Sequence, residues 1–168
     1  MPVTRAFPDA VTTVDTAAQY ELGTEWSMSA EEVASLSITG VVGPCVWRYI
    51  YNEPTATAAF AIGNVVSTLA AGTSPYNGVK SPTSSAPHRV IGVAQWAVAS
   101  GKYAWILKDG VGEVLADTGN IAASTPLVPG NAVAGAADDA AAITDAAFGV
   151  SLEGASATAT AQSRIRCI

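Results

Sequence analysis

The sequence predicts a mainly β protein, a compact antiparallel β-barrel or sandwich-like domain with an extended N-terminal arm and at most one or two short helices. Two observations favour this class. Runs rich in β-branched and aromatic residues at 41–51 and 89–116 alternate with polar residues, as half-buried strands do. Clusters of glycine and proline separate such runs at short intervals, which is typical of small barrels with tight turns.

Residues 89–116 give the clearest pattern and predict three strands joined by two turns. Asp109-Gly110 provides the positive φ angles of a two-residue hairpin, so Lys108 would pair with Val111 and Trp105 with Val114. This register predicts one buried face and an opposite face that is at least partly wet. The buried set is Tyr103, Trp105, Leu107, Val114 and Ala116, and the wet set is Lys102, Lys108 and Glu113.

The first elements are an arm over residues 1–19 and then a single β-rich domain over residues 20–168. The arm is apolar enough that it needs something to lie on, either its own domain or a neighbour. Residues 20–28 read as a strand with a kink at Gly23-Thr24. Ser29 and Glu32 form a capping box, and the helix that follows is limited to one or two turns before Gly40.

Residues 41–51 predict a strand whose start lies at an edge or a bulge, because Pro44 has no amide hydrogen to donate. The aromatic stripe that alternates along it indicates core packing or a subunit contact more than a ligand groove; it consists of Trp47, Tyr49 and Tyr51. A second buried strand lies near 60–69, with Gly63-Asn64 as a turn or bulge.

The remaining chain predicts a long loop at 72–88 and then short strands on tight turns. Leu127-Val128 and 132–134 are two of these pieces, and the last strands lie at 147–152 and 163–168. Ile91-Gly92-Val93 resembles Phe148-Gly149-Val150, which suggests two related strand pairs in one barrel-like sheet.

Composition limits the partners. Charged residues make up 13% of the 168 residues, against ~25% in an average protein, and the net charge is −6. Without a basic surface, nucleic acid and anionic membranes are poor partners. The charge-free stretch at 55–73 has polar residues in its middle and prolines outside both ends, so a buried strand is the better interpretation than a membrane span. Few solubilising charges favour a component of a larger assembly.

No catalytic constellation is present, so we expect no enzyme, no cofactor and no metal site.

Cys45 and Cys167 predict two buried free thiols, with one long-range disulfide as the alternative. Asp138, Asp139 and Asp145 lack the spacing of a calcium loop and indicate a polar loop. The N-terminus lacks the apolar core of a signal peptide, so export by the standard route is not expected. A small hydrolase would need a pocket near His88 or Asp138.

Several short motifs resemble those of small structural proteins from the heads of tailed bacteriophages. They are Arg89-Val-Ile-Gly-Val, Ser100-Gly-Lys-Tyr-Ala-Trp-Ile, Gly110, Tyr20-Glu-Leu-Gly-Thr, Trp47-Arg-Tyr-Ile-Tyr-Asn, Gly63-Asn-Val-Val and Phe148-Gly-Val. Ala104 stands where glycine is more usual in that pattern. The resemblance implies a capsid decoration (cement) protein: a β-rich module, often trimeric, made in the host cytoplasm, that clamps major capsid subunits on the outer surface of the virion without cofactor or catalysis.

The arm and the 72–88 loop are the segments from which we expect contacts with the major capsid protein or with sister copies. The predicted interface residues are Val3, Arg5, Phe7, Val11, Tyr76, Lys80 and His88. The alternative is a receptor- or glycan-binding module of a virion or cell surface that uses Trp26, Trp47 and exposed tyrosines as stacking platforms.

Overall fold

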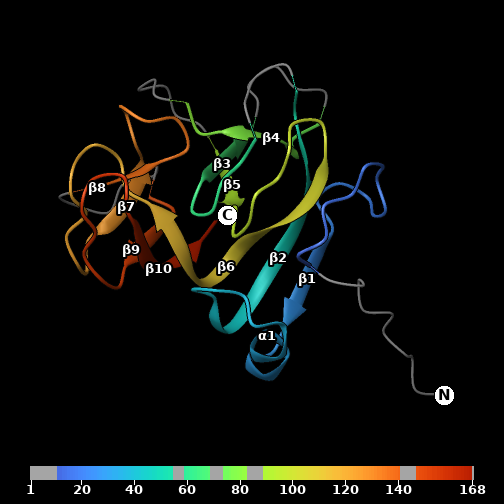
Figure 1. Cartoon of the computed structure of the whole chain (residues 1–168), viewed down its shortest axis with the longest axis horizontal. Coiled ribbons are helices and arrows are strands. Elements are labelled where there is room, and N and C mark those ends of the chain that lie inside the picture. The colour runs from blue at the N-terminus through green and yellow to red at the C-terminus, as the bar shows by residue number, and fades with distance from the viewer. Residues whose placement is uncertain (1–10, 55–58, 69–73, 83–88, 141–146, 168) are drawn as a thin grey trace.

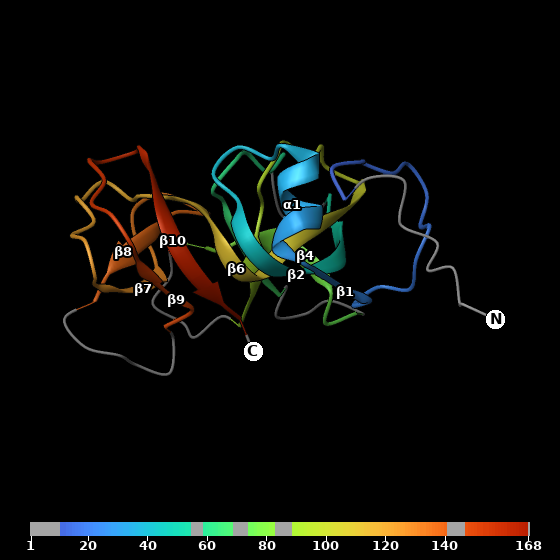
Figure 2. The same ribbon diagram turned by 90° about the horizontal axis from the view of Figure 1, so that it is seen from below.

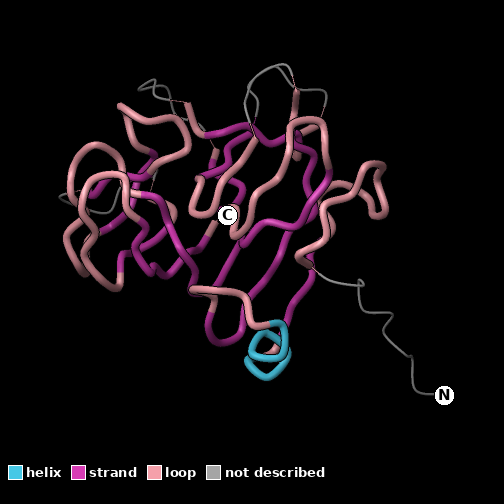
Figure 3. Tube along the Cα trace, in the orientation of Figure 1, coloured by secondary structure: helices cyan, strands magenta, loops and turns pink. Residues whose placement is uncertain are grey.

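The computed structural model describes residues 11–54, 59–68, 74–82, 89–140 and 147–167, and it confirms a mainly β fold (Figures 1 and 3). Within these residues, ten strands form one continuous sheet, and the seven-residue helix α1 is too short to span a bilayer. The elements are β1 (Glu25–Met28), α1 (Ala30–Leu36), β2 (Val42–Asn52), β3 (Val65–Thr68), β4 (Asn77–Lys80), β5 (Val90–Val93), β6 (Tyr103–Leu115), β7 (Pro126–Pro129), β8 (Ala137–Asp139), β9 (Gly149–Ser151) and β10 (Thr160–Arg166).

Five strands of the sheet close into a small barrel, which we call the first ring. Its strand order is β2-β4-β3-β5-β6, and β6 pairs back onto β2. The pairs are antiparallel except β2–β4, which is parallel. The predicted antiparallel barrel is therefore confirmed for the other pairs of the first ring, and the prediction is wrong for the β2–β4 pair.

A second ring shares β6 with the first and has the order β6-β8-β7-β9-β10. A single parallel bridge closes it, between Ala116, just after β6, and Ala137 in β8. The Asp117 amide donates to the Ala137 carbonyl oxygen at 2.8 Å and reinforces this closure. Figure 1 shows β6 running between the two rings, with β7 to β10 on one side and β2 to β5 on the other.

The two rings have the same topology, strand for strand: β2 to β6 of the first correspond to β6 to β10 of the second. The likeness of Ile91-Gly92-Val93 to Phe148-Gly149-Val150 reflects this repeat, since β5 and β9 are equivalent strands. Matching pairs are Val65–Val93 and Pro126–Val150, Val66–Gly92 and Leu127–Gly149, Thr68–Gly78 and Pro129–Ala137, Ile50–Ala104 and Val114–Ala161, and the bridges Phe60–Val98 and Ile121–Ala155.

Each ring encloses apolar side chains at equivalent positions. The first ring buries Ile50, Phe60, Val66, Ile91, Ala104 and Ile106. The corresponding residues of the second ring are Val114, Ile121, Leu127, Phe148, Ala161 and the polar Ser163, and all of them are buried. Complete burial of these side chains supplies the main favourable free energy of folding.

The predicted hairpin at Asp109-Gly110 is wrong, because β6 passes through both residues without turning. Leu107 pairs with Trp47 and Asp109 with Val46, so Lys108 is an extra residue in a β-bulge. A Cβ at Gly110 would lie 2.7 Å from Cβ of Cys45. Glycine is therefore required here by the close approach of β2, and not by a turn.

The predicted buried face of this segment is nevertheless correct. The extra residue at the bulge reverses which side chains of the strand face the core, as a two-residue turn would also do. Trp105, Leu107, Val114 and Ala116 therefore share one apolar cluster, against which Tyr103 packs. The opposite face is drier than predicted, since Ala104 and Ile106 are fully buried inside the first ring.

The N-terminal elements agree with the local signals. The capping box is present: the Ser29 amide donates to Glu32 Oε2 at 2.7 Å, and the Glu32 amide donates to Ser29 Oγ at 3.3 Å. Helix α1 ends at Ser37 in the left-handed conformation, before the predicted stop at Gly40. The pairing of β2 with β6 shifts register between Val42 and Val46, which confirms the irregularity expected around Pro44.

Other boundaries also differ from the predictions: β3 covers only 65–68 of the strand expected near 60–69, and β10 covers 160–166 and not 163–168. Strand β1 begins only at Glu25, after a turn in which Gly23 has a φ of 88°. The 72–88 segment contains strand β4, so it is not one long loop. The strand predicted at 132–134 lies at 137–139 instead, which places Asp138 and Asp139 in β8 and not in a loop.

Candidate interaction surfaces

The structure describes three of the seven predicted interface residues and does not bring them together. Val11 is only 2% exposed and belongs to the chain's own core. The arm was expected to lie either on its own domain or on a neighbour, and Val11 lies on its own domain. Tyr76 and Lys80 are half-buried, at the two ends of β4. Val3, Arg5, Phe7 and His88 lie outside the described residues.

Tyr76 and Lys80 both make internal contacts. The Tyr76 ring lies over the Arg48 guanidinium, 5.7 Å from its carbon, and packs against Gly23, where a Cβ would collide with it. The Lys80 stem lies beside Gly135, with its Cγ 3.2 Å from the position of a Cβ there. These contacts hold turns in place and leave only part of each side chain for a partner.

A buried charge joins four strands at the end of the first ring. Arg48, 3% exposed, donates to Glu25 Oε1 at 2.8 Å and to the Ile91 carbonyl oxygen at 3.1 Å. Lys108 Nζ donates to the same Glu25 carboxylate at 2.8 Å. Burial raises the pKa of Glu25, but hydrogen bonds from Lys108 and Arg48 outweigh it and lower that pKa below its ordinary value. The cluster is therefore a structural ion network.

The segment after the arm is fixed to the first ring by Tyr49. Its hydroxyl donates to Asp15 Oδ2 at 2.6 Å and accepts from the Gln19 amide at 3.2 Å. Burial, with the Asp15 carboxylate, raises the pKa of Tyr49. Asp15 also exchanges two backbone hydrogen bonds with Tyr103. This geometry holds a phenol in its neutral form and anchors the chain.

Asp117 is a buried acid with a shifted pKa. Burial raises its pKa, but backbone amides, first that of Ala132 and then that of Thr118, outweigh burial and hold the pKa below the ordinary value. Those two amides donate at 2.8 and 2.7 Å. The carboxylate thus closes the turn at 130–133 in the second ring.

Both cysteines are buried free thiols, which confirms the preferred interpretation. Burial raises the pKa of Cys45 to about 11 and that of Cys167 to about 12. Thiols of this kind are poor nucleophiles at neutral pH.

No group of three or more metal-ligating side chains occurs within the described part of the chain. Asp138 Oδ1 accepts from the Asp139 amide, 2.9 Å away, and His88 is outside the described residues. Trp47 is fully buried, so it is not accessible as a stacking platform for a glycan, and Trp26 is half-buried.

The sequence reasoning missed one partly exposed surface, in which Val42 and Val150 are exposed, Val111 and Pro126 are half-buried and Arg164 is charged. Five side chains from five adjacent strands lie in register on the outside of β2, β6, β10, β9 and β7; we call them the outer row. Next to it lies Leu152, just after β9, which is 49% exposed. The outer row consists of Val42, Val111, Arg164, Val150 and Pro126.

The sequence pattern marked the Val150 and Leu152 region as a strand but could not give its partners. The outer row depends on the pairing of five distant segments, and local alternation carries no information about that pairing. The only usable signal was the spacing of Val150 and Leu152, which places both on one face of a strand.

The sequence matches no protein-family model and no curated protein.

Proposed function

We propose that this chain is a virion structural protein that decorates the head of a tailed bacteriophage, binds the assembled major capsid lattice and stabilises it. The observation that supports a scaffold role is the state of the side chains with shifted pKa values. Glu25, Tyr49 and Asp117 are bonded to neighbouring parts of the chain, and Cys45 and Cys167 are buried. Shifted groups of a catalytic site would instead converge on a cleft.

Such a protein acts by mass action. A ligand that binds only the assembled lattice stabilises it by RT ln(1 + [L]/Kd) for each site, or about 2.7 kcal/mol at a hundredfold excess over Kd. Binding through several copies strengthens the attachment without new contacts. In this proposal the chain works on the outer capsid surface as a homo-oligomer, with a trimer as the expected state, and requires no cofactor.

Co-sedimentation tests the proposal. The purified chain is mixed with undecorated heads and, separately, with unassembled major capsid protein. We expect saturable binding to heads and at least tenfold weaker binding to free subunits, because the binding site spans lattice neighbours. Equal binding to both, or none to heads, would contradict the proposal.

Truncation locates the contact. Val11 and Asp15 belong to the folded domain, so the deletion is confined to residues 2–10. Lys80→Glu, at a half-buried position on β4, probes the loop side, and Ile62→Asp, at an exposed residue elsewhere, is the matched control. We expect weaker head binding from Lys80→Glu and wild-type binding from Ile62→Asp.

A further inference from the structure

Strand β1 is the one described strand that pairs on a single side. Ring closure uses both edges of β2 to β7, β9 and β10, and β8 meets the end of β6 through the Ala116–Ala137 bridge. Strand β1 pairs only with β2, and Figures 1 and 2 show it beyond β2, on the side away from the second ring. An unpaired strand edge is a template for the addition of another strand.

The backbone groups at this edge follow from the register of β1 on β2. The Tyr49 amide donates to the Thr24 carbonyl oxygen at 2.9 Å, so the backbone of Thr24 faces β2. Because this direction alternates along a strand, the N–H and C=O groups of Glu25 and Ser27 point away from β2. We call these four groups the open edge. Within the described residues they have no hydrogen-bond partner, and both residues are exposed.

The surroundings of the open edge are acidic. Residues 11–47 contain five carboxylate side chains and no lysine, arginine or histidine. The ion network described above matches the charge of Glu25, but Glu21, before β1, and Glu31, in the first turn of α1, are exposed on either side of the strand. This charge favours an added strand that carries lysine or arginine. It disfavours a second copy of the chain, which would bring the same carboxylates to the contact.

We propose that the open edge takes an extended, basic segment of a partner protein as an added strand. The backbone of that segment pairs with Glu25 and Ser27, and its cationic side chains lie near Glu21 and Glu31, which gives the contact its selectivity. Four backbone hydrogen bonds make a small contact, so one copy binds weakly and several linked copies bind more strongly. The inference concerns the kind of partner and does not depend on the capsid proposal.

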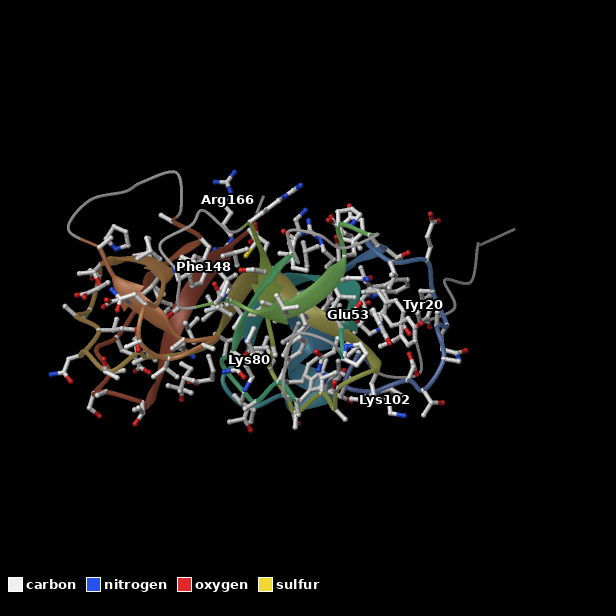
Figure 4. All side chains as sticks on the ribbon, turned by 90° about the horizontal axis from the view of Figure 1, so that it is seen from above. Tyr20, Glu53, Lys80, Lys102, Phe148 and Arg166 are labelled. Carbon is white, nitrogen blue, oxygen red and sulfur yellow. The ribbon has the colours of Figure 1, made fainter. Side chains whose placement is uncertain are left out.

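The open edge is preformed and lies apart from the second ring. Strand β1 is already extended in the folded chain, so only the partner segment loses conformational freedom on binding. Figure 4 shows Tyr20, which precedes β1, and Phe148 of the second ring toward opposite ends of the molecule. A strand added to β1 therefore leaves the second ring and its outer row uncovered.

Amide hydrogen exchange of the isotopically labelled full chain, followed by nuclear magnetic resonance, tests the inference. The probes are two synthetic peptides in which threonine alternates with lysine in one and with glutamate in the other. At saturation, the lysine peptide should slow exchange of the Glu25 and Ser27 amides at least tenfold. Exchange of the Trp26 and Met28 amides should not change, because they already pair with β2. The glutamate peptide should have no effect, and high salt should weaken binding of the lysine peptide.

Two substitutions at one position provide a second measurement. Ser27→Pro removes the N–H that points away from β2, whereas Ser27→Ala keeps it. We expect Ser27→Pro to bind the lysine peptide at least tenfold more weakly and Ser27→Ala to bind it as the wild type does, with circular dichroism verifying that both fold. If Ser27→Pro does not fold, the exchange measurement on the wild type decides.

Three results would each overturn the inference: equal binding by folded Ser27→Pro and Ser27→Ala, unchanged exchange of the wild-type Glu25 and Ser27 amides with the lysine peptide, or equal effects of the two peptides. Protection of these amides that grows with protein concentration alone would also overturn it, because the open edge would then belong to a contact with a second copy.

Discussion

At the residue scale, Gly110 shows why a strong local signal was misleading. Asp-Gly dipeptides commonly form hairpin turns because glycine tolerates positive φ. Here Gly110 has a φ of 139° within a continuous strand, and Asp109 bonds to Arg164 on β10 at 2.8 Å. Glycine is required both by this φ and by the close approach of Cys45, and both are set by the pairing with distant strands, so no window around Gly110 contains the information.

Gly110→Ala should lower the free energy of unfolding by about 2–4 kcal/mol, because the new methyl group collides with Cys45 and because alanine is strained at a φ of 139°. Gly43→Ala is the control: Gly43 also has positive φ, at 73°, but a Cβ there has no neighbour within 4 Å. It should cost about 1 kcal/mol of backbone strain alone. Urea denaturation measures both, and equal losses would contradict the close-approach explanation.

The Glu25 network makes stability depend on pH. The pKa of Glu25 is lower in the folded state, so ionised Glu25 stabilises the protein above its unfolded pKa of about 4.3. This contribution is lost as the pH falls through the folded pKa. Glu25→Gln should therefore cost about 1–2 kcal/mol near pH 7, a modest value because Glu25 is 39% exposed, and progressively less in acid.

Unfolding free energies of the wild type and Glu25→Gln between pH 3 and pH 7 test this prediction. Glu21→Gln, at an exposed position before β1, controls for the loss of one carboxylate. A Glu25→Gln difference that stays constant over the whole range would show that ionisation of Glu25 contributes nothing.

At the scale of elements, those specified by adjacent residues were predictable and those specified by distant ones were not. The capping box at Ser29 and the alternation in β2 lie within short windows, and both elements occur where expected. Strand β4, with the sequence NGVK, has no alternation of its own. It is a strand because Val66 and Tyr51 lie on either side of it. The outer row could not be predicted from the sequence for the same reason, since it spans five strands.

Ser29→Ala should destabilise the protein by about 1 kcal/mol, because the Glu32 amide loses its acceptor at the start of α1. Ser35→Ala, in the same helix, removes only a hydroxyl that donates to the Glu32 carbonyl oxygen and should change stability by less than about 0.5 kcal/mol. Thermal unfolding followed by circular dichroism compares the two, and the reverse order would contradict the capping role.

At the scale of the whole molecule, β6 belongs to both rings, so neither ring can lose it and remain closed. Ile106 is buried inside the first ring and Leu127 inside the second. Ile106→Ala and Leu127→Ala should each cost about 2–5 kcal/mol, and each should shift one common transition. Tryptophan fluorescence reports on the first ring, and backbone circular dichroism reports on both. Separate transitions in Leu127→Ala would show that the rings unfold independently.

The capsid proposal is tested most directly by the thermal disruption of undecorated heads during a titration with the purified chain. Stabilisation by mass action predicts that the disruption temperature rises once the free concentration exceeds Kd and continues to rise with its logarithm. A disruption temperature that stays constant at saturating concentration, with the chain shown to be bound, would contradict a cementing role.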